Sequence, residues 1–146
     1  MAEGGIIQYV KETHGDVAYV HEIIHLGGGS KPVVFFGRDE SAFEAFVVGA
    51  VGWISGAANV TVKLQRELYD LVVVRKDYEK GRELYFKLLP WFLLTERRGR
   101  WIAYVKAALK LIGMDRGDPR KPLLPLNEKE IKELEEVLLK MGIIEE

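Results

Sequence analysis

The run Val33-Val34-Phe35-Phe36 is the feature that most constrains the fold of this chain. It consists of four consecutive β-branched and aromatic residues, bounded by Pro32 and Gly37, and this composition predicts a short strand. Its side chains do not alternate between apolar and polar, which is typical of a strand covered on both faces in a parallel sheet. Residues 6–11 and 52–55 have the same character. The sequence therefore predicts a parallel sheet of three strands.

Helices are predicted between these strands and after them. Apolar spacing indicates helices over 16–26, from about 39 to 49 and over 60–75, followed by helices after Asp77, over 98–112 and after Asn127. We expect Asp16, Asn59 and Asn127 to be N-caps, and Pro90 to kink or end its helix.

Strands that alternate with helices predict an α/β fold built from right-handed βαβ units. Residues 1–75 would form three such units, and residues 76–146 a C-terminal helical region. Three strands leave two open, apolar sheet edges, so we expect these edges to be shared with another chain.

Composition excludes several functions. The 146 residues carry a net charge of −1 and include no cysteine. Disulfides, thiolate catalysis and cysteine-based metal sites are therefore excluded, and attraction to nucleic acid or anionic lipid is not expected.

Residues 45–62 are uncharged, but their glycines favour a buried strand and turns over a membrane span. The N-terminal sequence resembles no signal peptide, so we expect a cytoplasmic protein; the scarcity of Asn and Gln favours a thermophilic source.

The segment His21-Glu22-Ile23-Ile24-His25 matches the short zinc-hydrolase motif. On a helix, the two imidazoles lie one turn apart and can bind one zinc ion, with the glutamate as general base. The pattern offers no third histidine ligand at the usual spacing. An amphipathic surface helix with two solvated histidines is the more common interpretation.

Lys11 stands at the carboxyl end of the predicted strand 6–11. Parallel α/β proteins place catalytic groups at this end of their strands. Desolvation would lower the lysine pKa from about 10.4 and free the amine to form a Schiff base with a carbonyl. Position alone fits equally a lysine that is solvated or paired with a carboxylate.

Five blocks of sequence, in the same order and at similar spacing, resemble the dihydrodipicolinate synthase/N-acetylneuraminate lyase superfamily. The blocks are Val10–Asp16, Phe36–Asp39, Gly49–Val60, Val105–Leu109 and Pro122–Leu126. The resemblance implies strands six to eight of a (β/α)₈ barrel with their helices, followed by the C-terminal helical region. It also implies a class I lyase or aldolase that acts on pyruvate or another 2-keto acid without a metal or other cofactor.

The resemblance assigns roles to three residues. Lys11 would form the imine with the keto acid, Gly37 would lie beside the carboxylate of that acid, and Ile54 would contribute a backbone carbonyl. His14 stands where the family has a small residue, and Gly99–Tyr104 replaces the Asn-Pro motif of the synthases. These departures leave the substrate open beyond a 2-keto acid.

The family's tyrosine acid/base and its second-strand hydroxyl have no counterpart in this sequence. Without the tyrosine, proton transfer loses a factor of about 10²–10⁴. We therefore expect an incomplete site, and a partner that is either a second copy or a chain carrying the N-terminal half. A non-catalytic half-barrel that assembles with itself remains an alternative.

Overall fold

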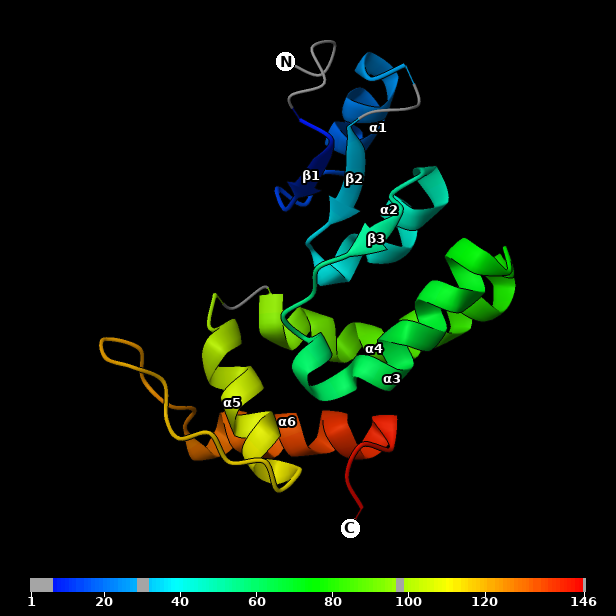
Figure 1. Ribbon diagram of the computed structural model, residues 1–146. Helices are drawn as coiled ribbons and strands as arrows, with labels where there is room; N and C mark the ends of the chain where they lie inside the picture. Colours follow the sequence, from blue (N-terminus) through cyan, green and yellow to red (C-terminus); the bar gives the residue numbers. More distant parts are fainter. Residues whose placement is uncertain (1–6, 29–31, 97–98, 146) are drawn as a thin grey trace. The chain divides into compact units, whose positions relative to one another are not determined.

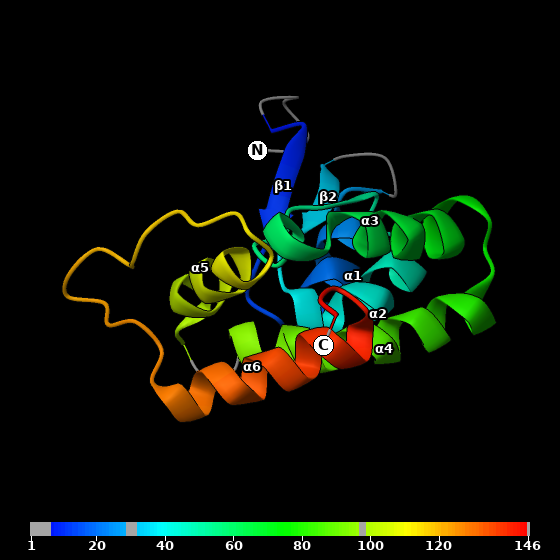
Figure 2. The same cartoon turned by 90° about the horizontal axis from the view of Figure 1, so that it is seen from below.

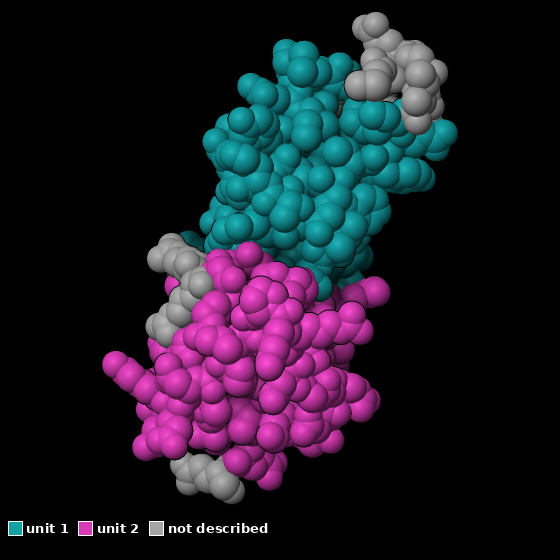
Figure 3. All heavy atoms as spheres, turned by 90° about the vertical axis from the view of Figure 1, so that its left-hand side faces the viewer, with its two compact units in different colours: residues 1–55, 67–82 teal, residues 56–66, 83–146 magenta. Residues whose placement is uncertain are grey.

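The computed structural model describes residues 7–28, 32–96 and 99–145, and the chain divides into two compact units. The first unit comprises Met1–Ser55 and Glu67–Arg82, and the second comprises Gly56–Arg66 and Glu83–Glu146 (Figure 3). All strands of the described chain lie in the first unit.

The first unit contains a parallel sheet of three strands, β1 (Tyr9–Glu12), β2 (Val33–Phe36) and β3 (Gly52–Trp53), in the order β1-β2-β3 (Figure 1). The predicted parallel pairing is confirmed. The third strand is shorter than predicted: the Ile54 N–H still donates to the Phe36 carbonyl at 2.9 Å, but the ladder ends there.

The two faces of the sheet are covered differently. Val34 and Phe36 are fully buried, on the face that α1 (Val17–Leu26) contacts. On the opposite face Phe35 is only half-buried and Tyr9 is 65% exposed, and their rings meet at 6.1 Å. The expectation of a strand covered on both faces therefore holds for only one face within this chain.

Helix α1 begins where the sequence predicts, because the Asp16 carboxylate accepts a hydrogen bond from the Ala18 N–H at 2.9 Å. Helix α2 (Ala42–Val48) follows a 3₁₀ turn, η1 (Asp39–Ser41), and ends at Gly49, whose φ of 119° suits glycine. The predicted helix over 39–49 thus consists of two pieces.

Helix α3 (Ala58–Tyr69) begins before Asn59, and it continues into a π-helical turn, η2 (Asp70–Val74). Asn59 is therefore not the N-cap that we expected; its side-chain amide donates to the Gly56 carbonyl at 2.8 Å. The start of a helix depends on which backbone groups are already bonded, and sequence indicates it only within a residue or two.

Helix α4 (Tyr78–Glu96) continues past Pro90, where we expected a kink or an end. The two following residues, Trp91 and Phe92, are fully buried, and the Trp91 indole N–H donates to the Ala57 carbonyl at 3.3 Å. This burial keeps the segment after the proline helical despite the hydrogen bond that a proline removes.

The second unit has its core among α4, α5 (Trp101–Leu111) and α6 (Glu128–Met141), with Tyr104, Leu134 and Leu138 fully buried. The predicted cap at Asn127 is confirmed as a capping box with Glu130. An extended segment joins α5 to α6 (Figure 2), and the Lys106 ammonium donates to its Arg116 and Gly117 carbonyls at 2.7 and 3.1 Å. None of the described helices combines the length and hydropathy that crossing a bilayer requires.

Candidate active site

The carboxyl ends of the three strands meet at one edge of the sheet, as they must in a parallel sheet. Two backbone hydrogen bonds join them: the Gly37 N–H donates to the Glu12 carbonyl at 2.7 Å, and the Ile54 N–H donates to the Phe36 carbonyl at 2.9 Å. The predicted site residues Lys11, Gly37 and Ile54 therefore follow one another across this edge of the sheet.

Lys11 and Gly37 are in direct proximity. A Cβ on Gly37 would lie within 3.0 Å of the Lys11 Cε, closer than real Cβ atoms come to their neighbours. The backbone conformation of Gly37 does not require glycine, since its φ is not positive. Glycine is needed at this position because the lysine side chain crosses directly over it.

Lys11 is exposed and lies on the less covered face of the sheet, paired in register with Phe35. Among the residues that the structure describes, no carboxylate forms an ion pair with it. Phe35, the residue of β2 that lies opposite Lys11, has its ring against β3: a Cβ on Gly52 would clash with this ring. The amine therefore projects from an apolar surface without a protein partner, which is one condition for a lysine nucleophile.

Thr13 joins this cluster, and sequence reasoning did not select it. Its Oγ1 also lies within 3.0 Å of the Cβ position on Gly37, on the same side as Lys11. The spacing of two residues after Lys11 was visible in the sequence, because alternate residues of an extended chain share a face. That signal is weak at a strand end, where the chain leaves the sheet.

The loop after Lys11 is held by its own side chains. The His14 N–H donates to the Glu12 carboxylate, and the His14 ring meets the Tyr19 ring edge-on at 4.6 Å. Gly15 takes a φ of 96°, a left-handed conformation that favours glycine. His14 itself is exposed, at the same end of the sheet as Lys11.

Ile54 lies directly after β3, and its side chain is 48% exposed. Its backbone N–H is used within the sheet, as described above. The role of its carbonyl in substrate binding remains a prediction.

The zinc-hydrolase hypothesis gains no support. His21, Glu22 and His25 are exposed on α1, as expected for a surface helix. Within residues 7–28, 32–96 and 99–145, no group of three or more His, Cys, Asp or Glu side chains could hold a metal ion. The motif therefore lacks a third protein ligand in this part of the chain.

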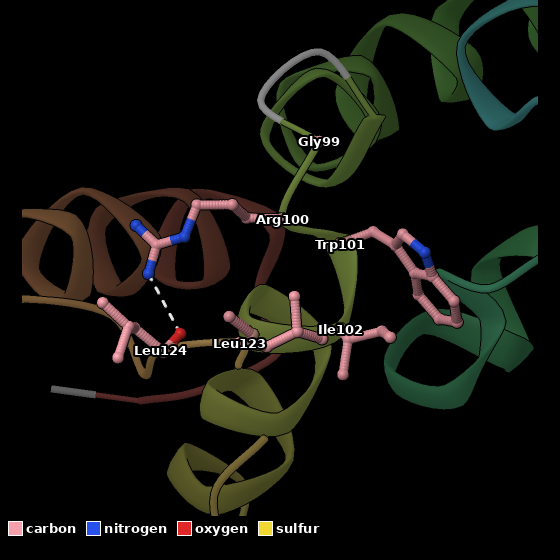
Figure 4. A pocket seen from close by; sticks show the side chains of 7 residues that line it. Gly99, Arg100, Trp101, Ile102, Leu123 and Leu124 are labelled. Atoms are coloured by element: carbon pink, nitrogen blue, oxygen red, sulfur yellow. Dashed lines mark hydrogen bonds between the residues drawn. The ribbon is translucent and has the colours of Figure 1, made fainter. Parts of the chain in front are cut away.

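The stretch that replaces the Asn-Pro motif has a structural role. Arg100 pairs with Glu130 and donates to the Leu124 and Pro125 carbonyls at 3.1 and 2.8 Å; Figure 4 shows the bond to Leu124. The adjoining depression of about 70 Å³ is lined by Gly99–Ala103, Leu123 and Leu124. It is far smaller than the roughly 300–1,000 Å³ of sites for small organic molecules, so we assign it no ligand.

The sheet is parallel, with Lys11 near its carboxyl end, and comparison with known proteins gives the family. Residues 4–141 match the Dihydrodipicolinate synthetase family. The chain belongs to this family.

The chain is similar to 4-hydroxy-tetrahydrodipicolinate synthase of Methanocaldococcus jannaschii, with 34% identity over 94% of this chain and 46% of that protein. Among solved structures it is similar to dihydrodipicolinate synthase from Thermotoga maritima, with a TM-score of 0.85 and 30% identity over 98% of this chain and 48% of that one. It is also similar to KD(P)GA from T. tenax, with a TM-score of 0.76 and 27% identity over 96% and 48%. The chain thus spans about half the length of these relatives.

The sequence-based identification of the family is therefore confirmed. The hypotheses of a zinc hydrolase and of a non-catalytic half-barrel find no counterpart among these relatives, two of which are described as synthases.

Proposed function

We propose that this chain carries the imine-forming part of a class I lyase or aldolase that acts on pyruvate or a related 2-keto acid. The observation that supports it best is the placement of Lys11 over Gly37 at the carboxyl ends of a parallel sheet in a member of this family; no carboxylate of the described residues forms an ion pair with this lysine. The strands β1 to β3 would correspond to strands six to eight of a (β/α)₈ barrel. Active sites in such barrels form at the carboxyl ends of the strands.

The chemistry follows from the amine. The Lys11 nitrogen attacks the keto carbon, and the carbonyl oxygen takes up protons and leaves as water, giving a protonated imine. This imine withdraws electrons from the adjacent carbon, so that loss of a proton or cleavage of a carbon–carbon bond there gives a neutral enamine. In this role the backbone at Gly37 would lie beside the keto-acid carboxylate, with the Ile54 carbonyl at the neighbouring strand end.

The substrate beyond the keto acid stays open. Similar proteins include a 4-hydroxy-tetrahydrodipicolinate synthase and a KD(P)GA, and the chain matches about half the length of each. The stretch Gly99–Tyr104 differs from the synthases, which leaves a keto-sugar-acid aldolase as open as a synthase.

A complete site would need a partner. β1 is an edge strand of the described sheet, and its first residue, Tyr9, is 65% exposed on the face that carries Lys11. A second copy or a chain with the remaining strands would cover this face and could supply the acid/base group that this chain lacks. Sedimentation analysis tests this expectation, and a stable monomer that turns over a keto acid would contradict it.

The imine is tested by reductive trapping. We expect pyruvate and borohydride to add one reduced pyruvyl group to Lys11, located by peptide mass spectrometry. Lys11→Arg keeps the positive charge but cannot form the imine, so it should lose this adduct completely. Lys110→Arg, at an exposed position on α5, is the matched control and should keep it.

Two results would overturn the proposal. One is modification of other lysines while Lys11 remains unmodified. The other is undiminished trapping in Lys11→Arg.

A further inference from the structure

A groove of about 440 Å³ lies between α2 and the first turns of α4. Its lining consists of three apolar or aromatic residues and two charged ones: Phe43, Val47, Tyr78, Glu79 and Arg82. All five belong to the first unit, and none of them lies in a strand. The groove is therefore a feature of one unit, and it shares no residue with the candidate active site.

Close packing holds the walls of this groove in place. A Cβ on Gly81, in the first turns of α4, would lie 2.5 Å from the Val72 Cγ2 and 3.4 Å from the Phe43 ring. Helix α2 also contacts η2 and α1. Glycine at position 81 thus lets the start of α4 approach both η2 and α2 closely, so the groove exists before anything binds in it.

The apolar side chains of the groove are exposed in this chain. Val47 is 47% exposed, and Tyr78 is 44% exposed. Apolar surface that is bordered by charged residues is typical of a site of interaction. Covering these side chains would remove apolar area from water, which favours association.

The two charged residues of the groove have no ion-pair partner in the part of the chain that the structure describes. Asp77 and Lys80, at the same end of α4, form an ion pair at 3.3 Å. Glu79 and Arg82 lie three positions apart on the helix, but they form no such pair with each other or with another described residue. The apolar groove is thus bordered by one negative and one positive charge that are available to a partner.

We propose that this groove is a contact surface for a second copy of the chain, related to the first by a two-fold axis. Such a contact brings the same surface of both copies together, so the surface must be complementary to itself. This groove meets that requirement. With the two α4 helices antiparallel, Glu79 of each copy lies opposite Arg82 of the other, and the apolar side chains of both copies are covered.

The contact is small and depends on neither the imine chemistry nor a partner at the sheet edge. Five residues a side are fewer than the roughly 20–30 of a standard protein interface. We therefore expect a weak association that depends on protein concentration.

The test reverses the two charges separately and together. Two copies of Arg82→Glu would present only negative charge across the contact, and two copies of Glu79→Arg only positive charge. We expect the dissociation constant of each variant to rise at least about 10-fold, because like charges would face each other. Sedimentation velocity over a range of protein concentrations measures this constant.

Two rescue experiments make the test specific. An equimolar mixture of Glu79→Arg and Arg82→Glu places opposite charges across the contact and should restore association. The double variant with both substitutions should associate with itself for the same reason. Lys87→Glu, at an exposed position of α4 outside the groove, is the matched control and should associate like the unaltered chain.

The outcomes separate this inference from the proposed function. A chain that stays monomeric at every concentration overturns the contact and leaves the groove to a different occupant, such as a small apolar ligand. Unchanged association in both single variants also overturns it, because the copies then meet elsewhere, as at the open sheet edge. Absence of reductive trapping at Lys11 in the unaltered chain overturns only the proposed function; circular dichroism verifies that each variant is folded.

Discussion

Lys11 and Arg100 are two cationic side chains that differ in burial and in their bonds to the rest of the chain. Arg100 is two-thirds buried, pairs with Glu130, and donates to the Leu124 and Pro125 carbonyls. Lys11 is exposed, and within the described residues no carboxylate forms an ion pair with it. A cation that is bonded to its own chain stabilises structure, whereas one with no ion pair to a described carboxylate is available for chemistry.

The surroundings of the two cations differ in the same sense. Arg100, at the start of α5, bonds Glu130 of α6 and two carbonyls of the extended segment that precedes α6. Lys11 crosses a glycine that leaves room for it, on a sheet face that the chain covers only partly.

After the complete loss expected in Lys11→Arg, the largest effect is expected from Gly37→Ala. The new methyl group would displace the flexible end of the Lys11 side chain and the stiffer Thr13 side chain, and it would lie 3.2 Å from the Glu12 carbonyl oxygen. We expect the fold to survive these shifts, and circular dichroism verifies it. A misplacement of about 1 Å costs reaction rate by up to 100-fold. We therefore expect trapping of pyruvate at Lys11 to slow by about 10- to 100-fold, measured by mass spectrometry over time.

Gly113→Ala serves as its control, since no atom lies near the Cβ position there. That glycine has a positive φ, so the substitution strains the backbone but leaves the site alone. Unchanged trapping in Gly37→Ala would mean that Lys11 does not need its observed position.

Arg100→Ala should give the next largest effect, and on stability alone. It removes an ion pair and two hydrogen bonds and leaves Glu130, which is mostly buried, without this partner. We expect the free energy of unfolding to fall by about 2 kcal/mol, measured by urea denaturation.

An equal loss in the free energy of unfolding in Lys11→Ala and Arg100→Ala would contradict the contrast drawn between the two cations. Removal of an exposed, unpaired side chain should change the free energy of unfolding by no more than about 0.5 kcal/mol. Once folded, Arg100→Ala should retain reductive trapping at Lys11.

The smallest effect is expected at Asp77, whose carboxylate accepts a hydrogen bond from a nearby backbone N–H. The Lys80 N–H donates to its carboxylate at the start of α4, and this hydrogen bond lowers the pKa of Asp77 below 3.8. A lowered pKa contributes stability above the unfolded value, and this contribution is lost as the pH falls through the folded value. Asp77→Asn should therefore lower the urea midpoint at about pH 6 and differ less from the unaltered chain at about pH 3.

Elements defined by neighbouring residues could be predicted well. The strand propensity of the β-branched and aromatic run Val33–Phe36 and the N-caps at Asp16 and Asn127 depend on neighbouring residues, and the structure places them as predicted; the capping-box partner Glu130 was not predicted. The start of α3 and the passage of α4 through Pro90 could not be predicted, because Ala57 and the buried Trp91 decide them from 34 residues apart.

The sequence by itself determined that Lys11 lies near the carboxyl end of a strand and that this strand belongs to a parallel sheet. The five blocks of sequence that resemble the family also suggested a role for the lysine. Only the tertiary structure decided that the Lys11 and Thr13 side chains meet over Gly37, and that Arg100 forms an ion pair with Glu130. The physical reason is that strand pairing and helix packing bring together residues some 25–30 positions apart, and no local propensity encodes which side chains will then share the same space.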